Sequence, residues 1–142
     1  MAVAWDDSLA TGVLTVDQQH RELFRQVAGF GEAMKKGKGR DELGRILDFL
    51  GSYVKTHFAE EEKAMERFAC PAAAANKQAH AQFLATFTDL RKRFDESGAG
   101  PAIVLEISDT LGKWLVNHIR GIDLKLRDCG SQAKPQLVGA QS

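Results

Sequence analysis

Apolar residues recur at intervals of three and four positions through four long segments of this chain, and glycine or proline residues separate the segments. Such spacing places the apolar residues along one face of an α-helix. Helices are therefore predicted over about 17–37, 41–69, 72–96 and 101–129. Because short connections make consecutive helices antiparallel neighbours, the pattern predicts an all-α, up-down-up-down four-helix bundle.

The parts of the 142-residue chain outside these helices are an N-terminal arm over 1–16 and a C-terminal tail over 131–142. One domain over 1–130 is expected, because typical domains have about 100–150 residues. Asp17 begins the first periodic segment and is predicted to be the N-cap of its helix. The sequence contains neither the alternating pattern of strands nor an internal repeat.

Charge and hydropathy exclude several classes of partner. Lys and Arg together number 19, as do Asp and Glu, so the formal net charge is zero. Neither nucleic acid nor an anionic membrane surface is expected as a partner, because both attract basic surfaces. No run of about 18 apolar residues could span a membrane. The first residues lack the basic and apolar regions of a secretion signal, so a cytoplasmic location is expected.

The two cysteines, Cys70 and Cys129, lie near predicted helix ends. Thiols are kept reduced in the cytoplasm, so a reduced pair is expected, with a disulfide as the alternative. Neither cysteine belongs to a CxxC motif or a Cys/His cluster. Neither is therefore predicted to bind metal.

Each of the four histidines lies on the apolar stripe of a different predicted helix. His20 and His80 come early in the first and third helices, whereas His57 and His118 come late in the second and fourth. In an antiparallel bundle all four fall at the same end. A single histidine of this kind is more often a hydrogen-bonded core residue than a ligand. Four that converge indicate a metal site, because a metal ion satisfies buried imidazoles.

Glu61 lies one helical turn after His57, about 6 Å along the helix axis. Both residues continue the apolar stripe, so both are expected to reach one metal centre. A surface pair is the more common arrangement at this spacing and would contribute only a few tenths of a kcal/mol. The other two members of the run Glu60–Glu62 are expected to be solvated.

Asp123 lies five residues after His118 and, on an ideal helix, about 140° away around the axis. The two side chains would not share one face. Either the helix is distorted there, as in a π-bulge, or the site reaches around the helix. Alternatively, Asp123 is a solvated carboxylate paired with Lys125 or Arg127.

Other conspicuous features favour structural roles. Phe83, Phe87 and Phe94 have the spacing of core residues, and Lys35–Arg40 is expected to be a basic turn between helices. The chain has no glycine-rich phosphate loop, no Ser/His/Asp signature and no context for a cysteine nucleophile. The common signatures of nucleotide binding and of covalent catalysis are therefore missing from the sequence.

In order and spacing these residues resemble the bacterial hemerythrin family, whose members are non-haem di-iron proteins that bind O2. The resemblance runs from Trp5 to about Cys129. It rests on five blocks, which are Trp5–Gly12, Asp17–His20, His57–Glu61 with Met65, Pro71–His80 and Trp114–Asp123. It implies two iron ions joined by an oxo or hydroxo bridge.

The resemblance also implies a role for each candidate ligand. Glu61 and Asp123 would bridge the two irons. The remaining ligands are the histidines, with His20 and His57 on the iron that has an open position for O2, and His80 and His118 on the other. A further set would form the oxygen pocket, in which Leu115 matches a family position that walls the pocket and Phe24, Ile119 and Trp114 are assigned beside it.

One position departs from the family pattern, which has His-x-x-x-His in the third helix. Here the segment reads Asn76-Lys-Gln-Ala-His80, so the second iron would have two imidazoles in place of three. Asn76 could offer its carbonyl oxygen as a weaker neutral ligand or leave the position to water. Cys70 also replaces the aromatic residue that the family has before Pro71.

Three functions are compatible with this pattern. The first is an O2-binding protein for storage, delivery or sensing, with O2 held as a hydroperoxide at the His20/His57 iron. Two carboxylates among neutral imidazoles favour it, because di-iron bundles that perform oxidative catalysis are richer in carboxylates. The second is a di-iron peroxidase or oxidase, acting on peroxide, O2 or nitric oxide at the position opened by Asn76. The third is a structural bundle with one metal ion or none. The sequence assigns no protein partner.

Overall fold

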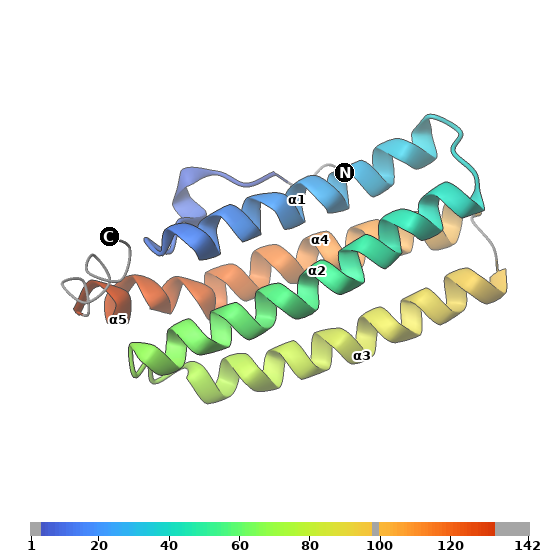
Figure 1. Ribbon diagram of the computed structural model, residues 1–142. Helices are drawn as coiled ribbons and strands as arrows, with labels where there is room; N and C mark the ends of the chain where they lie inside the picture. Colours follow the sequence, from blue (N-terminus) through green and yellow to red (C-terminus); the bar gives the residue numbers. More distant parts are fainter. Residues whose placement is uncertain (1–3, 98–99, 133–142) are drawn as a thin grey trace.

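A computed structural model describes residues 4–97 and 100–132 of the chain. Its four long helices, shown in Figure 1, are α1 (Leu14–Lys35), α2 (Arg40–Arg67), α3 (Ala73–Ser97) and α4 (Pro101–Gly121). Consecutive helices run in opposite directions, and the described ranges contain no strand. The predicted all-α, up-down-up-down bundle is confirmed. None of the helices in these ranges is long and apolar enough to cross a membrane.

The first helix begins earlier than predicted, and Asp17 is not its N-cap. Val13 occupies the N-cap position, and Asp17 lies in the first turn of α1. Its carboxylate accepts hydrogen bonds from the backbone N–H and hydroxyl of Thr11, both at 2.8 Å, and from the backbone N–H of Gly12. The acidic side chain therefore reaches backward along the chain and ties the arm to α1.

The segment predicted as one helix over 101–129 is divided. Helix α4 ends at Gly121, a 3-10 turn η2 spans Asp123–Lys125, and a short helix α5 spans Leu126–Gln132. At Ile122 the backbone leaves helical geometry, with φ −126° and ψ −54°. The distortion is therefore a break in the helix and not a π-bulge. Most of the predicted tail, from residue 133 onward, lies outside the described residues.

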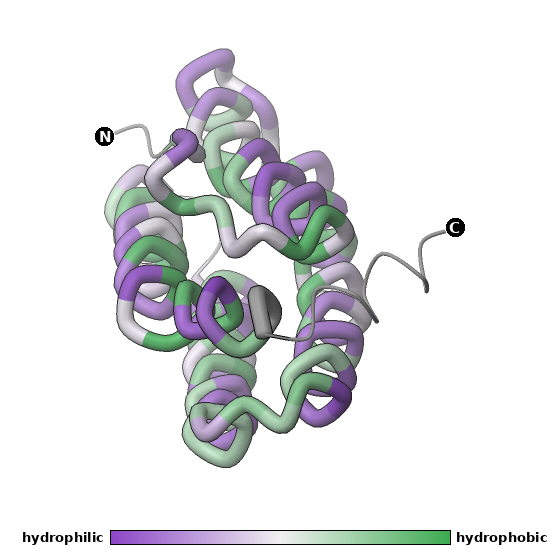
Figure 2. The backbone as a smooth tube through the Cα atoms, turned by 90° about the vertical axis from the view of Figure 1, so that its left-hand side faces the viewer, coloured by the Kyte–Doolittle hydropathy of each residue, from purple (hydrophilic) through white to green (hydrophobic). Residues whose placement is uncertain are grey.

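Viewed along the bundle in Figure 2, the four long helices surround a common interior, and hydrophilic and hydrophobic residues alternate along each helix. Most buried apolar side chains form one core along the length of the bundle. A separate group, here called the end cluster, lies where α1 begins and α2 ends. Its buried members are Val13, Val16, Met65, Phe68, Cys70, Ala72, Leu126 and Cys129.

The expectation of a reduced cysteine pair is wrong for this structure. Cys70 and Cys129 form a disulfide, with their Cα atoms 5.5 Å apart. The two residues are 59 positions apart in sequence. The fold brings them together because α5 packs against the connection between α2 and α3, a contact that no local pattern reveals.

Candidate metal centre

The four histidines converge at one end of the bundle, as their positions on the four helices predict. His20, His57, His80 and His118 come from α1, α2, α3 and α4 respectively. All four are buried. Steps of three and four residues keep each histidine on the stripe that faces the bundle interior, so its imidazole points inward and not toward solvent.

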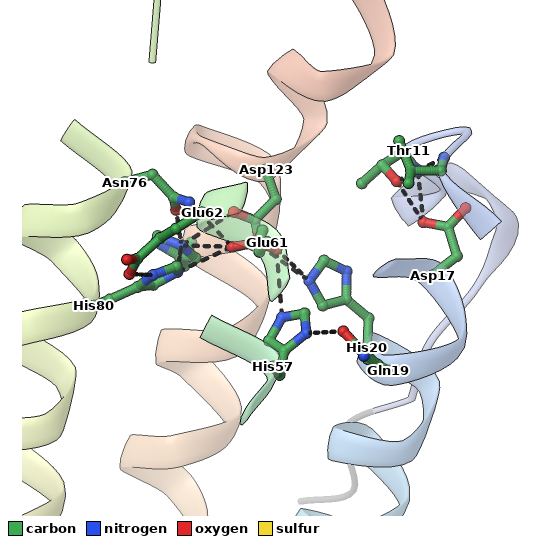
Figure 3. Close-up of polar contacts among 12 residues, drawn as sticks. Thr11, Asp17, Gln19, His20, His57, Glu61, Glu62, Asn76, His80 and Asp123 are labelled. Carbon is green, nitrogen blue, oxygen red and sulfur yellow. Dashed lines mark hydrogen bonds and ion pairs between the residues drawn. The ribbon is translucent and has the colours of Figure 1, made fainter. Parts of the chain in front are cut away.

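Glu61 lies at the centre of this arrangement, fully buried on α2 (Figure 3). Its Oε2 atom is 3.0 Å from His20 Nε2 and 3.3 Å from His57 Nε2. Its Oε1 atom is 2.9 Å from His80 Nε2 and 4.0 Å from His118 Nε2. Each carboxylate oxygen therefore faces a different pair of imidazoles.

Asp123 repeats this arrangement from the opposite side. Its Oδ2 atom is 3.1 Å from His20 Nε2, and its Oδ1 atom is 3.1 Å from His118 Nε2. Only 1% of the residue is exposed, so the alternative of a solvated carboxylate is wrong. The break after Gly121 explains how Asp123 reaches the site, because a continuous helix would have turned its side chain away from His118.

The donors form two overlapping sets, and within each set the ligand atoms lie within 4.8 Å of one another. One set is His20, His57, Glu61 and Asp123, and the other is Glu61, His80, His118 and Asp123. Imidazole nitrogen with carboxylate oxygen is a donor set that suits iron and other first-row transition metals. Two buried carboxylates also need positive charge nearby. The residues present therefore fit two metal ions that share Glu61 and Asp123.

One buried polar atom supports this fit. Asp123 Oδ1 makes no hydrogen bond within the described part of the chain. Asp123 Oδ1 is 3.1 Å from His118 Nε2 but lacks hydrogen-bond geometry to it. Buried polar atoms are normally paired. A metal ion between Asp123 and His118 would satisfy that oxygen.

Asn76 is also part of the site and is fully buried. Its Nδ2 group donates a hydrogen bond to Glu61 Oε1 at 3.2 Å. Its Oδ1 atom accepts one from His118 Nε2 at 2.9 Å. Asn76 therefore faces only the His80/His118 side, with its oxygen beside the ligand nitrogen of His118.

Two outer residues orient the histidines, and the sequence did not indicate either of them. His57 Nδ1 donates to Gln19 Oε1 at 2.7 Å, and His80 Nδ1 donates to Glu62 Oε2 at 2.8 Å. A proton on Nδ1 leaves Nε2 free to bind metal. The expectation that Glu62 is solvated is wrong, because the residue is half-buried against His80. Gln19 and Glu62 each directly neighbour a candidate ligand in the sequence, and each contacts a histidine on an adjacent helix. A polar residue next to a candidate ligand is the signal that could have identified these two residues.

The carboxylates raise the pKa of two of the imidazoles, those of His20 and His80. Burial opposes the charged form of His20, but hydrogen bonds and charges from Asp123 and Glu61 outweigh it and raise its pKa to about 9. The pKa of His80 is likewise raised, against burial, by Glu61 and Glu62. Burial would raise the pKa of Glu61, but hydrogen bonds from three histidines lower it well below its usual value. The site therefore attracts positive charge, either protons or metal ions.

Aromatic rings cover the second pair of imidazoles. Phe58 stacks on His80 with ring centroids 3.7 Å apart and planes 5° apart. Trp114 stacks on His118 with centroids 4.3 Å apart and planes 12° apart. These contacts hold the imidazole planes and separate the site from water on that side.

An apolar cavity of about 20 Å³ lies one helical turn from the histidines, toward the middle of the bundle. A space of this size holds about one small molecule. The residues that line it are Leu23, Val27, Leu50, Val54, Phe58, Phe83, Leu111, Trp114 and Leu115. Of the four residues assigned to the oxygen pocket, Leu115 and Trp114 line this cavity. Phe24 and Ile119 are buried in the same core but do not line it.

A four-helix bundle with two overlapping sets of imidazole and carboxylate donors is the architecture of a dinuclear metal-binding protein. Residues 11–128 match the model of the hemerythrin HHE cation-binding domain. The chain is 35% identical to a bacteriohemerythrin from Stenotrophomonas maltophilia, over 89% of this chain and 80% of the relative. It is 34% identical to a bacteriohemerythrin from Methylococcus capsulatus, over 84% of this chain and 88% of the relative.

Similarity also extends to a myohemerythrin and to a solved structure. A myohemerythrin from Riftia pachyptila is 28% identical over 87% of this chain and 89% of the relative. The crystal structure of a wild-type hemerythrin aligns with a TM-score of 0.76 and 30% identity, over 91% of this chain and 98% of that one. The protein belongs to the hemerythrin family, whose members are di-iron proteins that bind oxygen.

Proposed function

We propose that this protein binds two iron ions and holds O2 reversibly, for storage, delivery or sensing. The observation that carries the proposal is the position of the two carboxylates. Each has one oxygen near His20 and the other oxygen near His80 or His118, so each faces both halves of the site. Glu61 and Asp123 would bridge the irons. The terminal ligands would be His20 and His57 on one iron, and His80 and His118 on the other.

O2 would bind on the side of His20 and His57. This side has two imidazoles and two carboxylate oxygens but lacks a counterpart of Asn76, which faces His118. Iron held by these residues would supply two electrons, and a bridging hydroxide would supply one proton, so that O2 would be held as a hydroperoxide on this side. The adjoining cavity is apolar, and Leu115 lies in its wall. Such a wall excludes water, which would otherwise promote loss of the bound oxygen and leave ferric iron.

The test of this proposal is spectroscopic. Protein reconstituted with Fe2+ should contain two irons per chain and, after anaerobic reduction, should develop an absorption band with O2 that disappears when O2 is removed. Glu61→Gln is the matched variant, because it keeps the size of the side chain and removes the bridging charge. Irreversible conversion to a ferric spectrum would contradict O2 binding. Iron content near zero or one would favour the structural bundle.

A second candidate function is a peroxidase or oxidase acting on peroxide, O2 or nitric oxide. Asn76 favours it, because a neutral amide oxygen beside His118 is a weaker ligand than an imidazole and is more easily displaced. Asn76→His would close this position and should abolish turnover while preserving O2 binding. Asn76→Ala would leave it open. Turnover no faster than that of free iron would exclude an enzyme.

The cytoplasmic location of the protein, expected from its sequence, stays a prediction.

A further inference from the structure

The Cys70–Cys129 disulfide joins two connecting segments at the metal end of the bundle. Cys70 lies between α2 and α3, and Cys129 lies in α5, which Figure 1 shows at the same end as the α2–α3 connection. Both residues are buried in the end cluster. The disulfide lies outside the candidate ligand set, and the proposed function gives it no role.

The two joined segments carry ligands of the proposed centre. Asp123 lies between α4 and α5, directly before the helix that contains Cys129. On the other side of the bond, Glu61 lies on α2 and Asn76 lies on α3, so the connection containing Cys70 leads from one to the other. The disulfide therefore closes a covalent ring around the side of the site that Asp123 approaches.

Other contacts also hold the segment of Asp123. Ile122 packs against the end cluster, Leu124 packs against the main core, and the Asp123 carboxylate contacts His20 and His118. Beyond the end of α4, the backbone N–H of Ile122 donates to His118 O at 2.8 Å. In α5, Leu126 packs in the end cluster, and the guanidinium of Arg127 donates to the carbonyls of Ser8 and Ala10 through exposed hydrogen bonds. A helix as short as α5 is not stable by itself, so its attachments decide how firmly it supports the turn that carries Asp123.

We propose that the disulfide is a redox-controlled latch on the metal centre. In the oxidised state it holds α5 against the α2–α3 connection and keeps Asp123 at both metal positions. In the reduced state α5 opens more often, Asp123 withdraws with it, and the metal ions leave faster. This proposal rests on the proposed di-iron function, and it adds a control that the ligand set alone does not contain.

The chemistry of opening is thiol–disulfide exchange. Reduction breaks the bond between the two sulfur atoms, which take up two electrons and two protons and become the thiols of Cys70 and Cys129. A dithiol reductant supplies the two electrons and the two protons and itself becomes a disulfide. Because both cysteines are nearly buried, the reductant reaches the bond only when α5 opens locally. Metal bound through Asp123 must in turn favour the closed latch, since coupling between two sites is reciprocal.

The test measures metal release from the full-length protein loaded anaerobically with Fe2+, using a colorimetric chelator. The reductant is a water-soluble phosphine, which offers no thiol ligand to iron and becomes a phosphine oxide by taking oxygen from water. Reduction should accelerate release on the order of tenfold, the lower end of what loss of ligand support costs in metal affinity. Re-oxidation of the same protein should restore slow release, a measurement that requires no substitution.

Two variants separate the latch from general effects of the reductant. Cys70→Ala/Cys129→Ala should release iron quickly and equally with and without phosphine. Asp123→Asn, with the disulfide intact, should release iron quickly, and reduction should add little. Far-UV circular dichroism at the assay temperature verifies that every sample is folded. Equal release from oxidised and reduced wild-type protein would overturn the latch alone. Failure of the oxidised protein to retain any iron would overturn both the latch and the proposed function.

Discussion

At the end of the bundle distant from the histidines, the helices meet through hydrocarbon, with Phe30 and Phe94 buried and their ring centroids 6.4 Å apart. At the metal end they meet around four imidazoles, an amide and two carboxylates, and a separate apolar cluster and a disulfide cover that group. The first end is stabilised mainly by packing. The second buries charge that only protons or metal ions can balance.

This difference assigns the two ends different tasks. Apolar packing at the distant end, through residues such as Leu43 and Leu47, sets the register of the helices whether or not metal is bound. That register brings the histidines to one level before any ion arrives. The metal end can therefore contain groups that cost stability, because the rest of the bundle supplies it.

The largest effect on stability is expected at the distant end. Leu47→Ala removes a fully buried side chain from the main core and should lower the free energy of unfolding by about 2–5 kcal/mol. Leu105→Ala is the matched control, because Leu105 is 54% exposed and its truncation should change stability by about 0.5 kcal/mol or less. Denaturant unfolding of the metal-free protein measures both. Similar losses for the two variants would contradict the assignment of the core.

Removal of the disulfide should cause the second-largest loss in the free energy of unfolding. Cys70→Ala/Cys129→Ala opens a cross-link between residues 59 positions apart, which should cost about 2–4 kcal/mol because the unfolded chain gains freedom. Urea unfolding of metal-free protein gives the value, and wild-type protein with both thiols reduced serves as the comparison. A loss below about 0.5 kcal/mol would mean that the end cluster holds α5 without the cross-link.

The outer hydrogen bonds should change metal affinity more than stability. Gln19→Ala removes the acceptor that orients His57. It should weaken binding of the metal ion at the His20/His57 position by roughly 10–100-fold. Gln18→Ala is the control, because Gln18 precedes it on α1 and is exposed. Competition with a chelator of known affinity measures both variants. Equal affinities in the two would remove Gln19 from the metal centre.

The smallest effect is expected for an ion pair on the surface of the distant end. Arg93 on α3 contacts Glu106 on α4, with the closest atoms 2.6 Å apart and both side chains more than 40% exposed. Glu106→Gln should cost no more than about 1 kcal/mol, and less in high salt, because solvent screens exposed charges. Thermal unfolding at two ionic strengths measures the change. A loss as large as that of Leu47→Ala would mean that packing does not dominate at this end.

Sequence periodicity located the four long helices to within a few residues, except for the end of the fourth, because the 3.6-residue repeat is a local property of each segment. The same repeat placed His20, His57, His80 and His118 on inward faces at one end. It also placed Glu61, since this residue continues the stripe of His57. The convergence of these five side chains was therefore predictable from position and spacing.

Asp123 was ambiguous because its place depends on a break in the helix. Five residues after His118, an unbroken helix turns the side chain away, and Gly121 by itself does not specify the 3-10 turn that follows it. Asp17 was assigned to the wrong role for a related reason. Its partners are donors in the preceding arm, and the conformation of that arm follows from contacts with α1.

The sequence by itself determined the four amphipathic helices, the end at which the histidines meet and the set of imidazoles available to a metal. Only the tertiary structure decided the placement of Asp123, the hydrogen bonds of Gln19 and Glu62, the orientation of Asn76 and the pairing of Cys70 with Cys129. The physical reason is range. Helical periodicity is encoded by neighbours along the chain, whereas these contacts join segments that become neighbours only when the bundle packs.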